Sequence, residues 1–175
     1  MALSLFALAL GLSIQAAEPP AKGDACALPS GLREAVQQRF GSARVLRSAD
    51  LFEDERGLFQ KEHPGACPGL AHGQFFGPGQ RPAIALILLD VEPKKNVRLV
   101  VARPALAIWT LVEVDEFDAG TTAVVGKSKP GPKASAGTTA AKPASTDSVS
   151  LTSYETWRRL YVWNGRRFDR VPEGD

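Results

Sequence analysis

The sequence predicts an α+β protein: an antiparallel β-sheet, built from a meander and a C-terminal hairpin, with one N-terminal helix packed on it and a disordered insertion. Three observations predict this class. One early segment has helical periodicity, several strand-like segments then follow one another without helices between them, and a long stretch before the last of them is poor in large apolar residues.

The amino-terminal end has the order of an export signal. Residues Ala2 to Ile14 are apolar and uncharged, and small residues and then Glu18 follow them. The apolar run is shorter than the roughly 20 residues that a membrane-spanning helix needs. We therefore expect residues 1–17 to be a signal peptide and residues 18–175 to form a single secreted or periplasmic domain, with no stable membrane anchor after cleavage.

Cys26 and Cys67 are the only two cysteines of the chain. In an oxidising compartment such a pair is expected to form a disulfide, here closing a loop of about 42 residues. A catalytic thiol or a zinc site is the alternative. His63 and His72 lie near Cys67 in the sequence, but no second cysteine or histidine stands at zinc-ligand spacing.

The stretch "LPSGLREAVQQRFGS" predicts the helix. Ser30 is placed to cap it, apolar residues recur at helical spacing from Leu32 to Phe40, and Gly41 supplies the left-handed residue that ends it. One face of this helix is apolar. We therefore expect it to pack on the sheet.

A short strand and turn are predicted in "ARVLRSADLF", and a polar, irregular loop in "EDERGLFQKEHPG". Two interpretations exist for the carboxylates of this region, a metal or acid–base cluster and a solvated surface loop. Basic residues are interleaved with the acids, which favours the surface loop. The carboxylates concerned are Asp50, Glu53, Asp54 and Glu55.

The meander is predicted from three consecutive segments. "AIALILLDV" is almost wholly apolar, as in a central strand covered on both faces. "NVRLVVAR" and "LAIWTLVEVDEF" alternate in part. Pro104 lies between these last two and cannot donate to a sheet ladder, so the turn is placed there.

Residues 119–148 change in composition to Gly, Ala, Ser, Thr, Pro and Lys, which predicts a low-complexity, flexible insertion. Its lysines are widely spaced and have no aromatic neighbours for stacking on bases. The net charge of the whole chain is +2, with both signs spread along it. We therefore expect no nucleic-acid partner.

The C-terminal hairpin is predicted from Asn164 and Gly165, which lie between two aromatic and apolar runs. A two-residue turn there would place Trp163 opposite Arg166 and Tyr161 opposite Phe168. Aromatic rings beside arginines can stack on a sugar or another ligand. The alternative is that the rings belong to the core while the arginine stems lie along them. The candidate ligand-binding residues are Tyr161, Trp163, Arg166 and Phe168.

Together, "GQFFGPGQRPAIALILL" and "YVWNGRRFDRV" resemble small exported bacterial proteins that carry a single FG-GAP or VCBS-like unit. The resemblance implies a loop with a glycine framework, in which the family has aspartates that hold calcium. Here the framework is present, but Gln74, Pro78 and Pro82 stand where the family has aspartates. Calcium prefers several charged oxygen ligands. The resemblance thus implies a degenerate loop without metal or cofactor, a tight turn that leads into the central strand. The loop residues are Gly73, Gln74, Phe75, Gly77, Pro78 and Gly79.

The function expected from these residues is that of an exported, non-enzymatic binding or interaction module, whose partner is an envelope protein or a glycan. Two alternatives remain open. One is a secreted hydrolase using His72 or His63, although no nucleophile motif accompanies either histidine. The other is a glycan-binding module using Tyr161 and Trp163.

Overall fold

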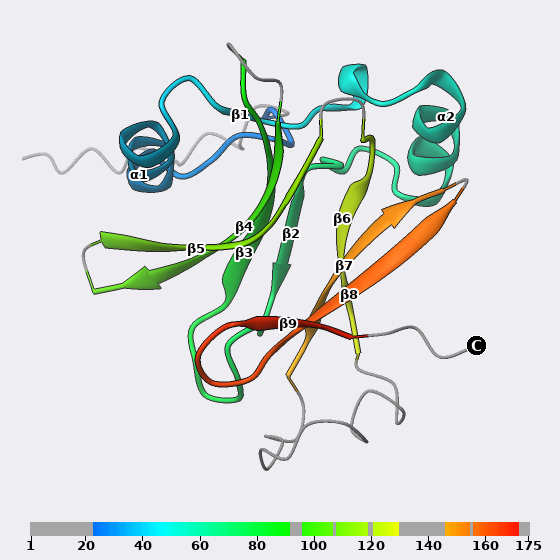
Figure 1. The fold of residues 1–175 in the computed structure, drawn as a ribbon. Helices are drawn as coiled ribbons and strands as arrows, with labels where there is room; N and C mark the ends of the chain where they lie inside the picture. The colour runs from blue at the N-terminus through cyan, green and yellow to red at the C-terminus, as the bar shows by residue number, and fades with distance from the viewer. Residues whose placement is uncertain are drawn as a thin grey trace, which may run out of the picture.

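The computed structural model shows two antiparallel sheets packed against each other, with one helix on the outer face of the larger sheet and a second helix at one end of the sheets (Figure 1). This confirms the predicted α+β class. The predicted leader lies outside the residues that the structure describes. These are residues 23–91, 96–106, 108–118, 121–129, 146–154 and 156–171.

The larger sheet has the strand order β1-β3-β4-β5, and β2 pairs with the same edge of β3 as β1 does. All of its pairings are antiparallel. Strands β3, β4 and β5 follow one another in sequence and in space, which confirms the predicted meander. The strands are β1 (Arg44–Val45), β2 (Leu70–Gly73), β3 (Ala83–Leu89), β4 (Val97–Ala105) and β5 (Ile108–Phe117).

Strand β3 is buried on both faces, as its continuous apolar sequence predicts. Side chains of successive strand residues point to opposite faces. Ala85 and Ile87 therefore join the core between the two sheets, while Leu86 and Leu88 join the core under the first helix.

The smaller sheet follows the chain order β6-β7-β8-β9 and covers one face of the larger sheet (Figure 1). Its residues Val149, Leu151 and Tyr161 are buried against that face. The amide of Val125 in β6 also donates to the carbonyl of Pro68, just before β2, at 2.9 Å. The strands are β6 (Val124–Ser128), β7 (Ser148–Ser153), β8 (Trp157–Trp163) and β9 (Phe168–Val171).

Helix α1 (Ser30–Phe40) covers the opposite face of the larger sheet with Leu32 and Val36, as predicted. Gly41 ends it with φ of 60°. The start differs by one position, because Ser30 is the first helical residue and makes no side-chain cap. No helix in the described part of the chain has both the length and the apolar character to cross a membrane.

The prediction of an irregular loop around the acidic residues is wrong, since Glu53–Glu62 forms helix α2. Glu55 and Phe59, one helical turn apart, face the core, and the acids of the first turn suit the positive end of the helix dipole. Glu55 is only 3% exposed and accepts a hydrogen bond from Ser153 at 3.0 Å. Asp50 pairs with Arg44, whose hydrogen bonds hold the pKa of the Asp50 carboxyl below its usual value.

The insertion predicted over residues 119–148 differs from the structure at its two ends. Val124–Ser128 and the start of Ser148–Ser153 pair as strands β6 and β7, and Val124 and Val125 are buried. The few β-branched residues of this segment pack into a core that is formed mainly by the rest of the chain. Residues 130–145 lie outside the described residues.

The predicted disulfide between Cys26 and Cys67 is present, with Cα atoms 5.1 Å apart. Both residues are buried beside the core under α1. The bond joins the segment before α1 to the segment before β2. Such bonds persist in oxidising environments.

Replacing both cysteines by alanine should lower the free energy of unfolding by about 4 kcal/mol. The reason is that the bond joins residues separated by 41 positions and so restricts the unfolded chain. Urea unfolding measures the change, and the wild-type protein under dithiothreitol is the matched control, which should lose a similar amount. A loss below about 1 kcal/mol in both samples would contradict the chain-entropy account.

Candidate functional site

The glycine loop between β2 and β3 is a tight turn that leads into the central strand, as predicted. Gly77 and Gly79 have φ of 121° and 77°, values that residues with a side chain rarely adopt. Gly73 has another role, because a Cβ atom there would lie 2.6 Å from the ring of Phe75. The turn therefore requires these glycines for its own shape.

Asp147 holds this loop in place. Its carboxylate accepts a hydrogen bond from the amide of Gln74 at 2.9 Å, and its own amide donates to the carbonyl of Gln74 at 3.2 Å. No local pattern indicates this pair, since Asp147 lies within the predicted insertion. Among the described residues, no group of three or more His, Cys, Asp or Glu side chains is arranged to hold a metal ion.

The loop and the C-terminal hairpin meet through aromatic rings. Phe75 lies fully in the core, whereas Phe76 packs edge-on against Trp163 and Phe168, with ring centroids 4.8 and 5.4 Å apart. Edge-to-face packing at these distances is favourable for aromatic rings. The two segments that carried the resemblance are thus neighbours in space.

The register predicted for this hairpin is wrong. Trp163 lies opposite Phe168 and Tyr161 opposite Arg170, so the connection is Asn164–Arg167 and not a two-residue turn. The reason is the Asn164 side chain, whose Oδ1 accepts hydrogen bonds from the amides of Arg166 and Arg167. Asn side chains stabilise longer turns in this way.

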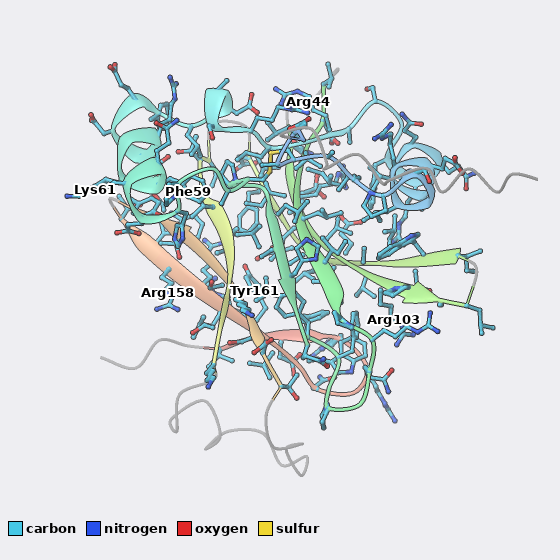
Figure 2. All side chains as sticks on the ribbon, turned by 180° about the vertical axis from the view of Figure 1, so that it is seen from behind. Arg44, Phe59, Lys61, Arg103, Arg158 and Tyr161 are labelled. Atoms are coloured by element: carbon cyan, nitrogen blue, oxygen red, sulfur yellow. A yellow bond between two sulfur atoms is a disulfide. The ribbon has the colours of Figure 1, made fainter. Side chains whose placement is uncertain are left out.

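The candidate ligand-binding residues are mostly part of the core. Tyr161 is 2% exposed and Phe168 8% exposed, Trp163 is half-buried, and Arg166 alone is exposed. The Tyr161 hydroxyl donates to Asp115 of β5 at 2.5 Å and so links the two sheets (Figure 2). The core interpretation of these aromatics therefore fits the structure, and the faces of Tyr161 and Phe168 are closed to a sugar.

The β4–β5 hairpin projects beyond the rest of the larger sheet (Figure 1). The turn predicted at Pro104 is wrong, because Pro104 pairs with Trp109 inside the hairpin. Strand β3 pairs with β4 only as far as Ala102, so Pro104 has a neighbouring strand on one side only, and proline is tolerated at such an edge.

The tip of this hairpin is apolar and exposed. Leu106 follows β4 with φ of 51° and is 99% exposed, and Ile108 at the start of β5 is 69% exposed. A residue with a side chain at positive φ is uncommon, and Gly or Asn usually occupies such turn positions. The sequence offered no sign of this tip, since its apolar residues were assigned to a strand.

A groove of about 240 Å³ lies between this hairpin and the glycine loop. The guanidinium of Arg103 lies 5.0 Å above the centroid of the Phe76 ring in this groove. Figure 2 shows Arg103 on the projecting hairpin, where it pairs with Thr110. The side chains that line the groove include those of Phe76, Gln80, Arg81, Arg103 and Leu106.

A second hollow of about 400 Å³ lies beside α1, next to Phe40 and Arg98. Its charges are already paired. Arg98 contacts Asp90 at 3.0 Å, Glu113 at 3.1 Å and Glu116 at 3.4 Å. The pKa of Arg98 is raised, mainly by its hydrogen bonds to Asp90. This arrangement is a structural ion-pair network.

Both histidines are exposed, and they lie on different elements. The nearest carboxylate to the His63 ring is that of Glu62 at 3.9 Å, and Ser153 donates to Glu55. In the described part of the chain, no hydrogen bond joins either imidazole to a serine or a cysteine. The nucleophile and base that a hydrolase requires are therefore not brought together among these residues.

Comparison of the chain with protein families, with curated proteins and with solved structures finds no match to any of them.

Replacing Asp147 by alanine should lower the free energy of unfolding by about 2 kcal/mol, because it leaves the Gln74 amide without its charged acceptor. Urea unfolding measures this loss.

A calcium site of micromolar affinity would stabilise the folded protein by about 4 kcal/mol in millimolar calcium. We expect no such site, so the wild-type protein should melt at the same temperature in EDTA and in millimolar calcium.

The matched control for Asp147 is Asp118→Asn, which alters an exposed carboxylate and should change stability little. Equal stability of the two variants would contradict the role assigned to Asp147. A calcium-dependent rise in melting temperature of several degrees would show that the chain holds the ion after all.

The two tyrosines of the chain should ionise only as the protein unfolds in alkali. Burial, then hydrogen bonding to Glu62, raises the pKa of Tyr154 to about 12. Burial, then hydrogen bonding to Asp115, raises the pKa of Tyr161. The pKa of a tyrosine in the unfolded chain is about 10. The two protonated tyrosines therefore contribute their full stabilisation of the fold below pH 10, and this contribution is lost as the pH rises toward 12.

Tyrosinate absorbance and circular dichroism, followed together against pH, test this expectation. Both signals should change in one transition. Tyrosinate that forms around pH 10 while the circular dichroism stays constant would contradict it.

Proposed function

We propose that the protein is a non-catalytic binding module that acts outside the cytoplasm and engages a partner protein through the tip of the β4–β5 hairpin. The observation that carries this proposal is the conformation and exposure of Leu106, which is 99% exposed at a φ of 51°. A single exposed apolar residue would need no explanation. Here, exposure, backbone strain and projection coincide at one residue.

The tip is unfavourable for the isolated fold in two ways. A left-handed conformation costs a residue with a side chain roughly 1–2 kcal/mol. The side chain of Leu106 recovers none of this by burial, and Ile108 beside it is also largely exposed. A partner that covers both side chains would supply the missing burial, and strained residues of this kind cluster at functional sites.

The frame that carries the tip is suited to binding. Arg103, Pro104 and Ala105 pair with β5 up to Ile108, so the tip is presented on a continuous ladder. Trp109 packs partly against the core under α1 and supports β5 from below. A rigid support lowers the entropy cost of binding.

The location outside the cytoplasm rests on two independent features. The disulfide requires an oxidising environment to persist. The first residues of the chain, from Ala2 to Ile14, have the pattern of an export signal. The resemblance to a degenerate FG-GAP-like unit belongs to the same proposal. In it, the contact between Asp147 and Gln74 takes the place of the calcium that the family's loop holds.

The test is selection of random peptides, displayed on phage, against the immobilised full-length protein. The selected peptides should lose affinity by about tenfold or more when Leu106 and Ile108 are both replaced by serine, since buried anchor residues dominate binding energy. Both side chains are exposed, so the double variant should keep the wild-type melting temperature.

Phe52→Ser is the matched control, because Phe52 is an exposed apolar residue away from the hairpin, and it should leave peptide affinity unchanged. Peptides that bind wild type and double variant equally would overturn the proposal. A protein that dimerises in sedimentation runs, and becomes monomeric in the double variant, would assign the tip to a second copy of the chain and overturn the proposal as well.

A further inference from the structure

Most arginines of the chain have a partner for their guanidinium group. Arg44, Arg47, Arg98, Arg159 and Arg167 form ion pairs with carboxylates of the described residues. Others donate to backbone carbonyls near the helices: Arg33, Arg39 and Arg56. These side chains are therefore occupied by the fold.

A few exposed arginines differ. Within the described part of the chain, the guanidinium groups of Arg81, Arg103, Arg166 and Arg170 form no hydrogen bond or ion pair. The guanidinium of Arg103 lies over the face of the Phe76 ring, a contact that leaves its N–H groups free to donate. Arginine without a carboxylate partner is available to bind one from another molecule.

Two of these arginines, Arg81 and Arg103, lie beside Phe76. Arg81 and Arg103 line the groove in which Phe76 lies. The Phe76 ring packs against Trp163 and Phe168, which flank the turn that carries Arg166. No Asp or Glu is among the residues that line the groove, so its positive charge is not compensated there.

We propose that this groove binds an Asp or Glu side chain of an acidic, apolar-anchored segment of the partner protein. The inference rests on the proposed function, since the apolar anchor is the one that covers Leu106 and Ile108. Arg81 and Arg103 bind the carboxylate through the paired N–H groups that suit carboxylate geometry. The partner segment therefore carries an apolar residue with acidic neighbours.

A polyanion such as a sulfated glycan fits these observations less well. A repeating anion needs a long row of cations, whereas the groove is small and one of its walls is the apolar Leu106. The net charge of the chain is only +2. Arginine beside exposed leucine matches a peptide that carries both an apolar and an acidic side chain.

The test uses those peptides from the random phage library whose binding depends on Leu106 and Ile108. They should be enriched in Asp or Glu near an apolar residue, and their affinity should fall as sodium chloride is raised. Arg103→Glu and Arg81→Glu should each weaken binding about tenfold or more, because like charges then face each other. Arg81 lies on an exposed loop, so Arg81→Glu should retain the fold even where Arg103→Glu does not.

Arg33→Glu is the control, because it makes the same charge change on α1 and should leave affinity unchanged. Peptides that need the tip, yet are neutral or basic and insensitive to Arg81→Glu and Arg103→Glu, would overturn the carboxylate site while the proposed function stands. Binding of heparin fragments that depends on both arginines, but not on Leu106, would assign the groove to a glycan and overturn the peptide. Absence of tip-dependent peptides would overturn both proposals.

Discussion

The burial of β3 on both faces is the constraint on which the rest of the fold depends. This strand pairs with β1, β2 and β4, and its alternating side chains enter two separate cores. Each face of β3 therefore needs its own cover. Helix α1 covers one face, and the smaller sheet covers the other. The disulfide, the glycine loop and the β4–β5 hairpin all adjoin this central strand or its direct neighbours.

Local sequence predicted the elements whose signal is local. The helix from Ser30, the meander and the Cys26–Cys67 bond could each be predicted from periodicity or composition. Helix α2 could not, because only Glu55 and Phe59 are buried and its other residues are polar, apart from Gly57 and the exposed Leu58. Strands β6 and β7 could not be predicted for a related reason. Tertiary packing, and not composition, decides whether a few valines are buried.

The groove depends on pairings between residues distant in sequence, which no short motif encodes. Asp147 contacts Gln74, and Phe76 contacts Trp163, across separations that only the packed sheets produce. The predicted hairpin register is wrong because a two-residue turn ignores the Asn164 side chain. That side chain accepts hydrogen bonds from the backbone amides of Arg166 and Arg167 and so stabilises a longer turn. The glycine framework of the loop was readable, since Gly77 and Gly79 act through their own backbones.

The ladder between β4 and β5 continues to Ala105 and Ile108, so the tip is separated from both cores by paired backbone. Substitutions or small insertions at Leu106 would therefore change this exposed surface without disturbing the packing of the domain. Selection for a different surface and selection for stability fall on different residues in such an arrangement. In the laboratory, that turn is a natural position for grafting a foreign recognition sequence.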